Sequence, residues 1–144
     1  MAERTVRFVA LDPGETTGYA RFDEKGEIVD FGQFKQSDQN EWLDTNITTD
    51  LLAVICEDYR NYNAQKRWSQ NRTSKNIGAI EFICQMRKVQ LILQGASVKK
   101  IGYKWSGLGE APSNHSISHQ YDAVAHGTYY LRMINVLKPR IPNE

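Results

Sequence analysis

The sequence has little of what marks secreted, membrane-spanning or zinc-binding proteins. It holds two cysteines, Cys56 and Cys84, both on apolar stretches and without CxxC or Cys/His spacing. This pattern predicts two buried thiols in a reducing compartment. No apolar run approaches the roughly 18 residues of a membrane span, and no segment resembles a signal peptide. We therefore expect a cytoplasmic protein with no membrane partner.

Net charge is also small, at +1, but it is unevenly distributed. Residues 1–57 hold 5 Lys/Arg and 12 Asp/Glu, whereas residues 58–144 hold 13 Lys/Arg and 5 Asp/Glu. A basic second half permits a polyanionic partner. The chain is 144 residues long and 40% apolar, without a linker or repeat, so residues 1–144 are expected to form a single domain.

Hydrophobic patterning predicts a mixed α/β domain in the order β-β-β-α-β-α-β-α. Three antiparallel strands open it, followed by a short helix from residue 37 or 38 towards 51. The continuous apolar run 51–56 is typical of a strand buried on both faces. The remaining predicted elements are a helix over 76–91, a strand over 97–101, a loop over 105–116, and a helix from 117 to 136 or 137. The later strands should be parallel, giving a mixed sheet flanked by helices.

Two acids follow predicted buried strands. Asp12 ends the first strand, just before a Pro-Gly turn, and Glu57 ends the apolar run. A carboxylate on a rigid strand end suits a metal ligand or a catalytic group. Alternatively, Asp12 only opens the turn, and Glu57 only marks where its strand meets water. The two residues taken singly leave both interpretations open.

A third group lies on the closing helix. His119 and Asp122 are three residues apart, and Asp122 and His126 four apart, so all three share one helical face. The opposite side is mostly apolar and is expected to pack on the sheet, which would turn the His/Asp stripe elsewhere. A solvated helix face is the alternative.

Together these motifs resemble the RuvC-type Holliday junction resolvases of the ribonuclease-H-like superfamily. The matching pieces are Leu11-Asp12-Pro13-Gly14 with Thr17-Gly18-Tyr19, Ile55-Cys56-Glu57, and His119-x-x-Asp122, with Asn76-Ile77-Gly78-Ala79 and Ser106-Gly107-Leu108-Gly109 in the spacer. The resemblance implies a ribonuclease-H-like fold and a homodimer that cuts four-way DNA junctions. The segment 57–76 departs from the cellular enzymes, and the chain is short for the family, which indicates a compact viral branch acting in the host cytoplasm.

The resemblance also implies a two-metal site. Two divalent ions about 4 Å apart stabilise the attacking and leaving oxygens of a phosphodiester. Mg²⁺ prefers carboxylate and water oxygens, so Asp12, Glu57 and Asp122 are the expected ligands, with Mn²⁺ able to substitute. Asp12 would bridge both ions. His119 would either ligate one ion or carry protons, and His126 is expected to be a partner of a ligand.

A basic, aromatic segment is the expected nucleic-acid contact. Basic groups can neutralise phosphates while aromatic rings stack on unpaired bases. Within residues 58–76 these candidates are Arg60, Lys66, Arg67, Trp68, Arg72 and Lys75. The alternative is a surface loop whose aromatic rings pack on its own domain. A second cluster, Lys99, Lys100 and Lys104, could place a lysine near the scissile phosphate.

Three other functions compete with junction cleavage. The first hairpin also resembles the phosphate-binding hairpin of actin-like kinases, but those proteins need a second hairpin and a second domain. A nuclease of the same fold could instead act on flaps, forks or RNA hybrids. The third candidate is a nucleic-acid-binding module without catalysis, against which the three acids argue.

Overall fold

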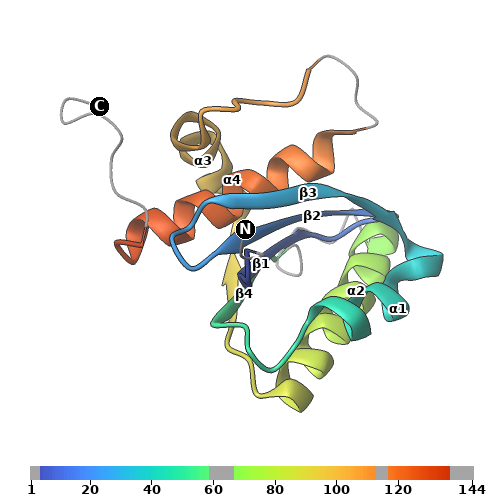
Figure 1. Ribbon diagram of the computed structural model, residues 1–144. Helices are drawn as coiled ribbons and strands as arrows, with labels where there is room; N and C mark the ends of the chain where they lie inside the picture. The colour runs from blue at the N-terminus through green and yellow to red at the C-terminus, as the bar shows by residue number, and fades with distance from the viewer. Residues whose placement is uncertain (1–3, 59–66, 113–116, 137–144) are drawn as a thin grey trace.

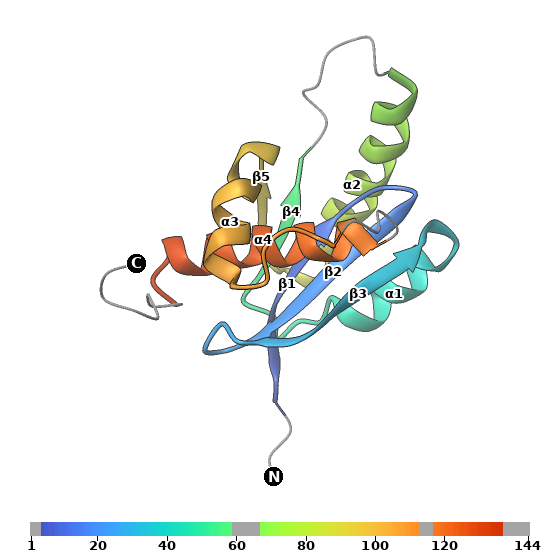
Figure 2. The same ribbon diagram turned by 90° about the horizontal axis from the view of Figure 1, so that it is seen from above.

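A mixed five-stranded sheet lies between helices on both of its faces (Figures 1 and 2). The computed structural model describes residues 4–58, 67–112 and 117–136, with the backbone alone for residues 67–73. Along the chain the strands are β1 (Val6–Asp12), β2 (Thr16–Asp23), β3 (Ile28–Lys35), β4 (Ala53–Glu57) and β5 (Leu91–Gln94). In the sheet their order is β3-β2-β1-β4-β5. The first three pair antiparallel, and β4 and β5 continue parallel to β1, which confirms the predicted mixed sheet.

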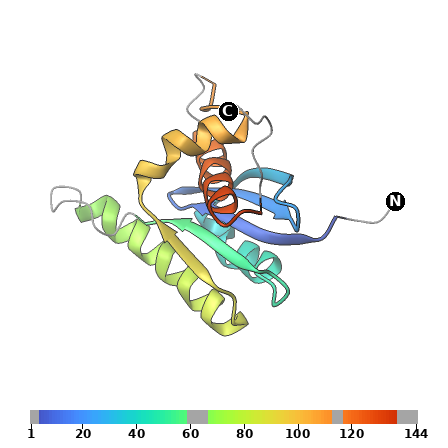
Figure 3. The same ribbon diagram turned by 90° about the vertical axis from the view of Figure 1, so that its left-hand side faces the viewer.

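Four α-helices flank this sheet within the described residues. They are α1 (Gln39–Asn46), α2 (Arg67–Arg87), α3 (Lys99–Ser106) and α4 (Ser118–Met133), with short 3-10 turns at Gln36–Asp38 and Ala96–Val98. Figure 3 shows α2 on one side of the sheet, and α3 and α4 on the other.

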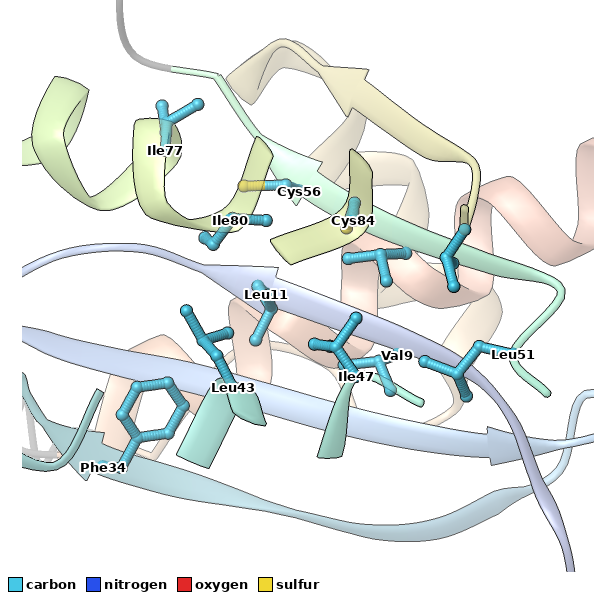
Figure 4. Packing of buried hydrophobic residues seen from close by; sticks show 12 residues of the cluster. Val9, Leu11, Phe34, Leu43, Ile47, Leu51, Cys56, Ile77, Ile80 and Cys84 are labelled. Carbon is cyan, nitrogen blue, oxygen red and sulfur yellow. The ribbon is translucent and has the colours of Figure 1, made fainter. Parts of the chain in front are cut away.

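Strand β1 is buried on both faces, so its alternating side chains belong to two separate cores. Val9 and Leu11 pack with residues of α1 and α2, as Figure 4 shows. Phe8 and Ala10 pack with α4 on the other face. All four are at most 3% exposed. Fully burying an aliphatic or aromatic side chain contributes about 1.5–3 kcal/mol. Asp12 therefore stands at the tip of a firmly held strand.

Small residues let α4 lie close to the sheet and to α3. A Cβ on Gly127 of α4 would be 2.3 Å from the Phe22 ring of β2. A Cβ on Gly102 of α3 would be 2.2 Å from the Ala125 carbonyl oxygen. Such distances are too short for any side chain, so glycine is required at both crossings.

The predicted last strand, 97–101, was wrong, and so was the end of the preceding helix. α2 ends at Arg87, where Lys88 takes a left-handed conformation (φ 57°) and Val89 N–H donates to the Cys84 carbonyl. This is a Schellman helix end. The last strand is β5, Leu91–Gln94, whose short apolar run continued the helical pattern and could not be separated from it by periodicity. Residues 99–106 form α3 instead, beside α4.

Two other boundaries differ from the prediction. α2 begins at Arg67, so the second part of the polar segment 58–76 is helical and not a loop. Its first turns extend past the end of β4 (Figure 3), where no sheet imposes an apolar stripe on the sequence. The loop predicted over 105–116 begins later, because α3 continues to Ser106 and ends at Gly107 (φ 76°).

Candidate active site

Two neighbouring strand ends place Asp12 and Glu57 together. β1 and β4 are parallel, with Leu11 opposite Cys56, so the residues that follow lie side by side at one edge of the sheet. Both side chains are fully buried. Carboxylates are almost never fully buried unless they are paired or bind a cation. The carboxyl groups of this pair therefore require partners, and α4 and α3 supply them.

Helix α4 brings His119 and Asp122 to these strand ends. Its first turn lies directly on β2, where a Cβ on Gly18 would be 1.9 Å from the His119 carbonyl oxygen. His119 Nδ1 is 2.8 Å from Asp12 Oδ2. One potential ligand atom from each of Asp12, His119 and Asp122 lies within 4.8 Å of the other two. Residues more than a hundred positions apart thus share one small volume.

Helix α3 adds a cation and a phenol to the site. Lys99 Nζ lies 3.1 Å from Glu57 Oε1 and 3.5 Å from Asp122 Oδ2. The Tyr103 hydroxyl donates a hydrogen bond to Asp122 Oδ1. Sequence reasoning expected a lysine of the cluster Lys99, Lys100 and Lys104 near the scissile phosphate but did not say which one. Tyr103 was missed, because it lies between the predicted strand 97–101 and the predicted loop 105–116 and no helix was expected there.

The buried His126 completes the surroundings of Glu57. Its Nε2 is 2.9 Å from Glu57 Oε1, and its Nδ1 is 2.8 Å from Gln94 Oε1. The predicted orientation of the His/Asp stripe was therefore wrong: His126 is fully buried over the strand ends, not turned away from the sheet. His126 thus contacts Glu57, the expected ligand, and its role as the partner of a metal ligand stays a prediction.

Burial and mutual repulsion control the charge of the two strand-end carboxyls. Burial raises the pKa of Asp12 to about 7; the hydrogen bond from His119 opposes this rise, and the nearby charge of Glu57 adds to it. Burial acts on Glu57 too, but the hydrogen bond and charge of His126, together with Asp12 and Lys99, leave its pKa lowered. The hydrogen bond to Asp12 raises the pKa of His119. Without a metal and below about pH 7, the pair therefore keeps one proton, which Asp12 holds.

These residues fit a divalent cation. Glu57 Oε2 is buried and has no hydrogen-bond partner among the described residues. A proton kept by two buried carboxyls marks a place where a cation would relieve the same repulsion. Carboxylate oxygens suit Mg²⁺ and Mn²⁺, and an imidazole nitrogen also suits Mn²⁺. Asp12, Glu57, His119 and Asp122 can supply these atoms, and their role as ligands stays a prediction.

The structure describes the predicted nucleic-acid residues only in part. Arg60 and Lys66 fall outside the described residues, and Arg67, Trp68 and Arg72 belong to the backbone-only turns of α2. Lys75 on α2, and Lys100 and Lys104 on α3, are exposed. Next to Lys75, the buried Asn76 donates through Nδ2 to the Gly14 carbonyl at 3.0 Å, which ties α2 to the turn after Asp12.

Comparisons with known proteins bear on the fold. No known family model matches this sequence, and no curated protein matches it either. Among the described residues, no helix is long and apolar enough to cross a membrane.

Solved structures do resemble the chain. One is Thermus thermophilus RuvC in complex with a Holliday junction substrate, with a TM-score of 0.64 and 16% sequence identity. Another structure of Thermus thermophilus RuvC has a TM-score of 0.62 and 17% identity. Both alignments cover 92% of this chain and 98% of the other. The protein therefore shares the ribonuclease-H-like α/β fold of these RuvC structures, and its own buried carboxylates lie at the strand ends.

Proposed function

We propose that this protein is a metal-dependent endonuclease that hydrolyses phosphodiesters of branched DNA, with the four-way Holliday junction as its substrate. The observation that carries the proposal is the convergence of Asp12, His119 and Asp122 from β1 and α4, with Glu57 of β4 next to Asp12. The fold likeness to RuvC, whose structure was solved in complex with such a junction, supports the choice of substrate.

The site residues would have separate roles in the hydrolysis. Two divalent ions, Mg²⁺ or Mn²⁺, would supply the positive charge that stabilises the attacking and leaving oxygens. Asp12, from its buried strand end, together with Glu57 and Asp122, would hold these ions. His119 would ligate from the first turn of α4 or, in its neutral form, take the proton of the attacking water.

Lys99 is suited to a second role. It lies between Glu57 and Asp122, and its pKa is raised: burial alone would lower it, but the charges of these two acids prevail. A lysine that is charged at every working pH, on the rim of an acidic site, can pair with a phosphate oxygen as charge develops there. This role gives α3 a function in catalysis beyond packing on α4.

We also propose a homodimer, since a four-way junction is cut symmetrically by two active sites and two-fold pairing is the commonest assembly. The basic segment of residues 58–76, with Lys100 and Lys104 on α3, would contact the DNA backbone. A cytoplasmic location, in the host cell for a compact viral branch, completes the proposal.

The test is a cleavage assay on a four-way junction, a flap, a replication fork and linear duplex, with Mg²⁺, with Mn²⁺ and with EDTA. We expect paired cuts in the junction that depend on the metal. Preferential cutting of flaps, forks or an RNA hybrid would favour another nuclease of the same fold. Metal-independent binding without any cutting would favour a non-catalytic module.

Matched variants connect the activity to the site. Glu57→Gln and Asp122→Asn keep the shape of each side chain and remove its charge, so cleavage should fall below detection while junction binding persists. The control is Glu24→Gln, which changes an exposed acid on the β2–β3 turn, at the far end of β2 from Asp12. If Glu57→Gln cuts as well as the control, the site is not where the chemistry occurs.

A further inference from the structure

The buried histidine beneath the candidate metal site has a feature that the proposed reaction does not use. His126 is fully buried, and both of its ring nitrogens have polar partners on different strands. Glu57 and Gln94, which receive these contacts, are direct register partners at the ends of β4 and β5. One imidazole thus links the helix that carries Asp122 to both strands.

The two oxygens of Glu57 have different surroundings. Oε1 faces protein donors, with His126 Nε2 at 2.9 Å and Lys99 Nζ at 3.1 Å. Oε2 is buried and has no hydrogen-bond partner among the described residues, so it is the oxygen available to a cation. A carboxylate with one oxygen held by fixed donors cannot rotate freely, so the other oxygen keeps a fixed direction.

We propose that His126 is a positioning residue, which holds Oε1 of Glu57 so that Oε2 is presented to a divalent cation, with Gln94 locking the imidazole ring in place. An ionised carboxylate only accepts hydrogen bonds, so Nε2 must carry a hydrogen toward Glu57. The amide of Gln94 can offer an oxygen or a nitrogen to Nδ1, and it therefore holds the ring in either tautomer.

Lys99 does not make His126 redundant. The lysine is on the rim, with its side chain 22% exposed, and its four-carbon stem is flexible. It also contacts Asp122, so it can move when a cation or a phosphate competes for the acids. His126 is fully buried and keeps its geometry. The fixed donor is therefore the imidazole.

This inference rests on the proposed function, because it takes Glu57 to be a metal ligand. The test is Mn²⁺ binding to the full-length protein by isothermal titration calorimetry, without DNA. His126→Leu removes the donor, and we expect Mn²⁺ affinity to fall about 10–100-fold, the usual effect of losing a hydrogen bond to a ligating group. His126→Gln places an amide N–H near the position of Nε2 and should restore most of the affinity.

The Mn²⁺ concentration for half-maximal cleavage should shift in parallel, while the rate at saturating Mn²⁺ changes much less. A matched control is Thr128→Val, a buried polar-to-apolar change on the same helix, which should leave Mn²⁺ affinity at the parent value. Gln94→Met tests the other end of the link and should weaken binding in the same direction, even if His126→Leu does not fold.

Three results would overturn the inference: parent-like Mn²⁺ affinity in folded His126→Leu, equal weakening by His126→Gln and His126→Leu, or parent-like affinity in Gln94→Met. Parent-like affinity in either variant would show that Glu57 binds the cation without this support. Equal weakening by the Gln and Leu variants would show that the ring matters for filling space and not as a hydrogen-bond donor. The two proposals fail separately. A parent protein that binds Mn²⁺ but cuts no branched DNA contradicts the nuclease, whereas normal cutting with an unaffected His126→Leu contradicts only the positioning role.

Discussion

Replacing Asp12 by asparagine should make the metal-free protein more stable from about pH 5 upward. Asp12 is fully buried next to Glu57, and burial raises its pKa to about 7 from an ordinary 3.8. Folding above pH 3.8 therefore requires either the uptake of a proton or the burial of a second charge. Asparagine has nearly the same shape, can donate to Glu57 as the protonated acid does, and never carries the charge.

The size of the effect is set by the two pKa values. The folded protein binds the proton more tightly than the unfolded chain, so Asp12 favours folding at low pH and this contribution is lost as pH rises from about 4 to about 7. Each pKa unit corresponds to about 1.36 kcal/mol. At pH 5, about 1.2 above the ordinary pKa, Asp12 lowers the free energy of unfolding by about 1.6 kcal/mol. At pH 8 the whole difference of about 3.2 between the two pKa values counts, and the loss reaches at most about 4 kcal/mol.

The measurement is urea unfolding of the parent and Asp12→Asn in EDTA at pH 5 and pH 8. We expect the variant to be more stable at both, with the larger gain at pH 8. Added Mn²⁺ should then stabilise the parent much more than the variant, because the cation replaces the proton. Equal gains at the two pH values, or a loss at pH 8, would refute the argument that Asp12 is held at a cost in stability for binding a cation.

The same geometry supports predictions for His119, for the first turn of α4 and for the basic segment. His119 must lose its proton to ligate, and Asp12 raises its pKa, so the cleavage rate should already decline, as pH is lowered, before pH 6.5 is reached. The pH–rate profile of His119→Asp should lose part of this acid limb, and His119→Ala should lose most activity. If the profiles of His119→Asp and the parent coincide, the limb belongs to the Asp12 and Glu57 pair. Gly18→Ala should displace the first turn of α4, destabilise the protein by about 1–3 kcal/mol or more, and weaken Mn²⁺ binding. The control Gly78→Ala has open space around its Cβ position and should stabilise α2 slightly. Parent-like Mn²⁺ affinity in Gly18→Ala would contradict the close approach of α4 to β2. Variants that remove the charge of Lys66, Arg67 or Arg72 should bind every DNA form more weakly. The slope of log binding constant against log salt concentration should become shallower by roughly 0.9 for each duplex phosphate that is no longer neutralised. Trp68→Ala should instead reduce the preference for branched over linear DNA, through stacking worth about 1–3 kcal/mol per base, and unfolding of this variant would place the ring in the core.

Local patterns were enough to find the metal-binding candidates. Asp12 and Glu57 each follow a run of apolar residues, and a strand that is buried on both faces has this signature wherever it sits in a sheet. His119 and Asp122 share a face of α4 because the helical period is a local property. These features depend on neighbours in the chain, so the sequence by itself determined them, along with the mixed α/β order.

Only the tertiary structure decided what surrounds these residues. The apolar residues 91–93 fit a helix or a strand equally, and pairing with β4 made them a strand, which then placed Gln94 opposite Glu57. That pairing left residues 99–106 to form α3, and so brought Lys99 and Tyr103 to the acids. The direction in which His126 points was likewise set by the crossing of α4 over the sheet. Contacts of this kind join residues 19 to 107 positions apart, and no periodicity within one segment records them.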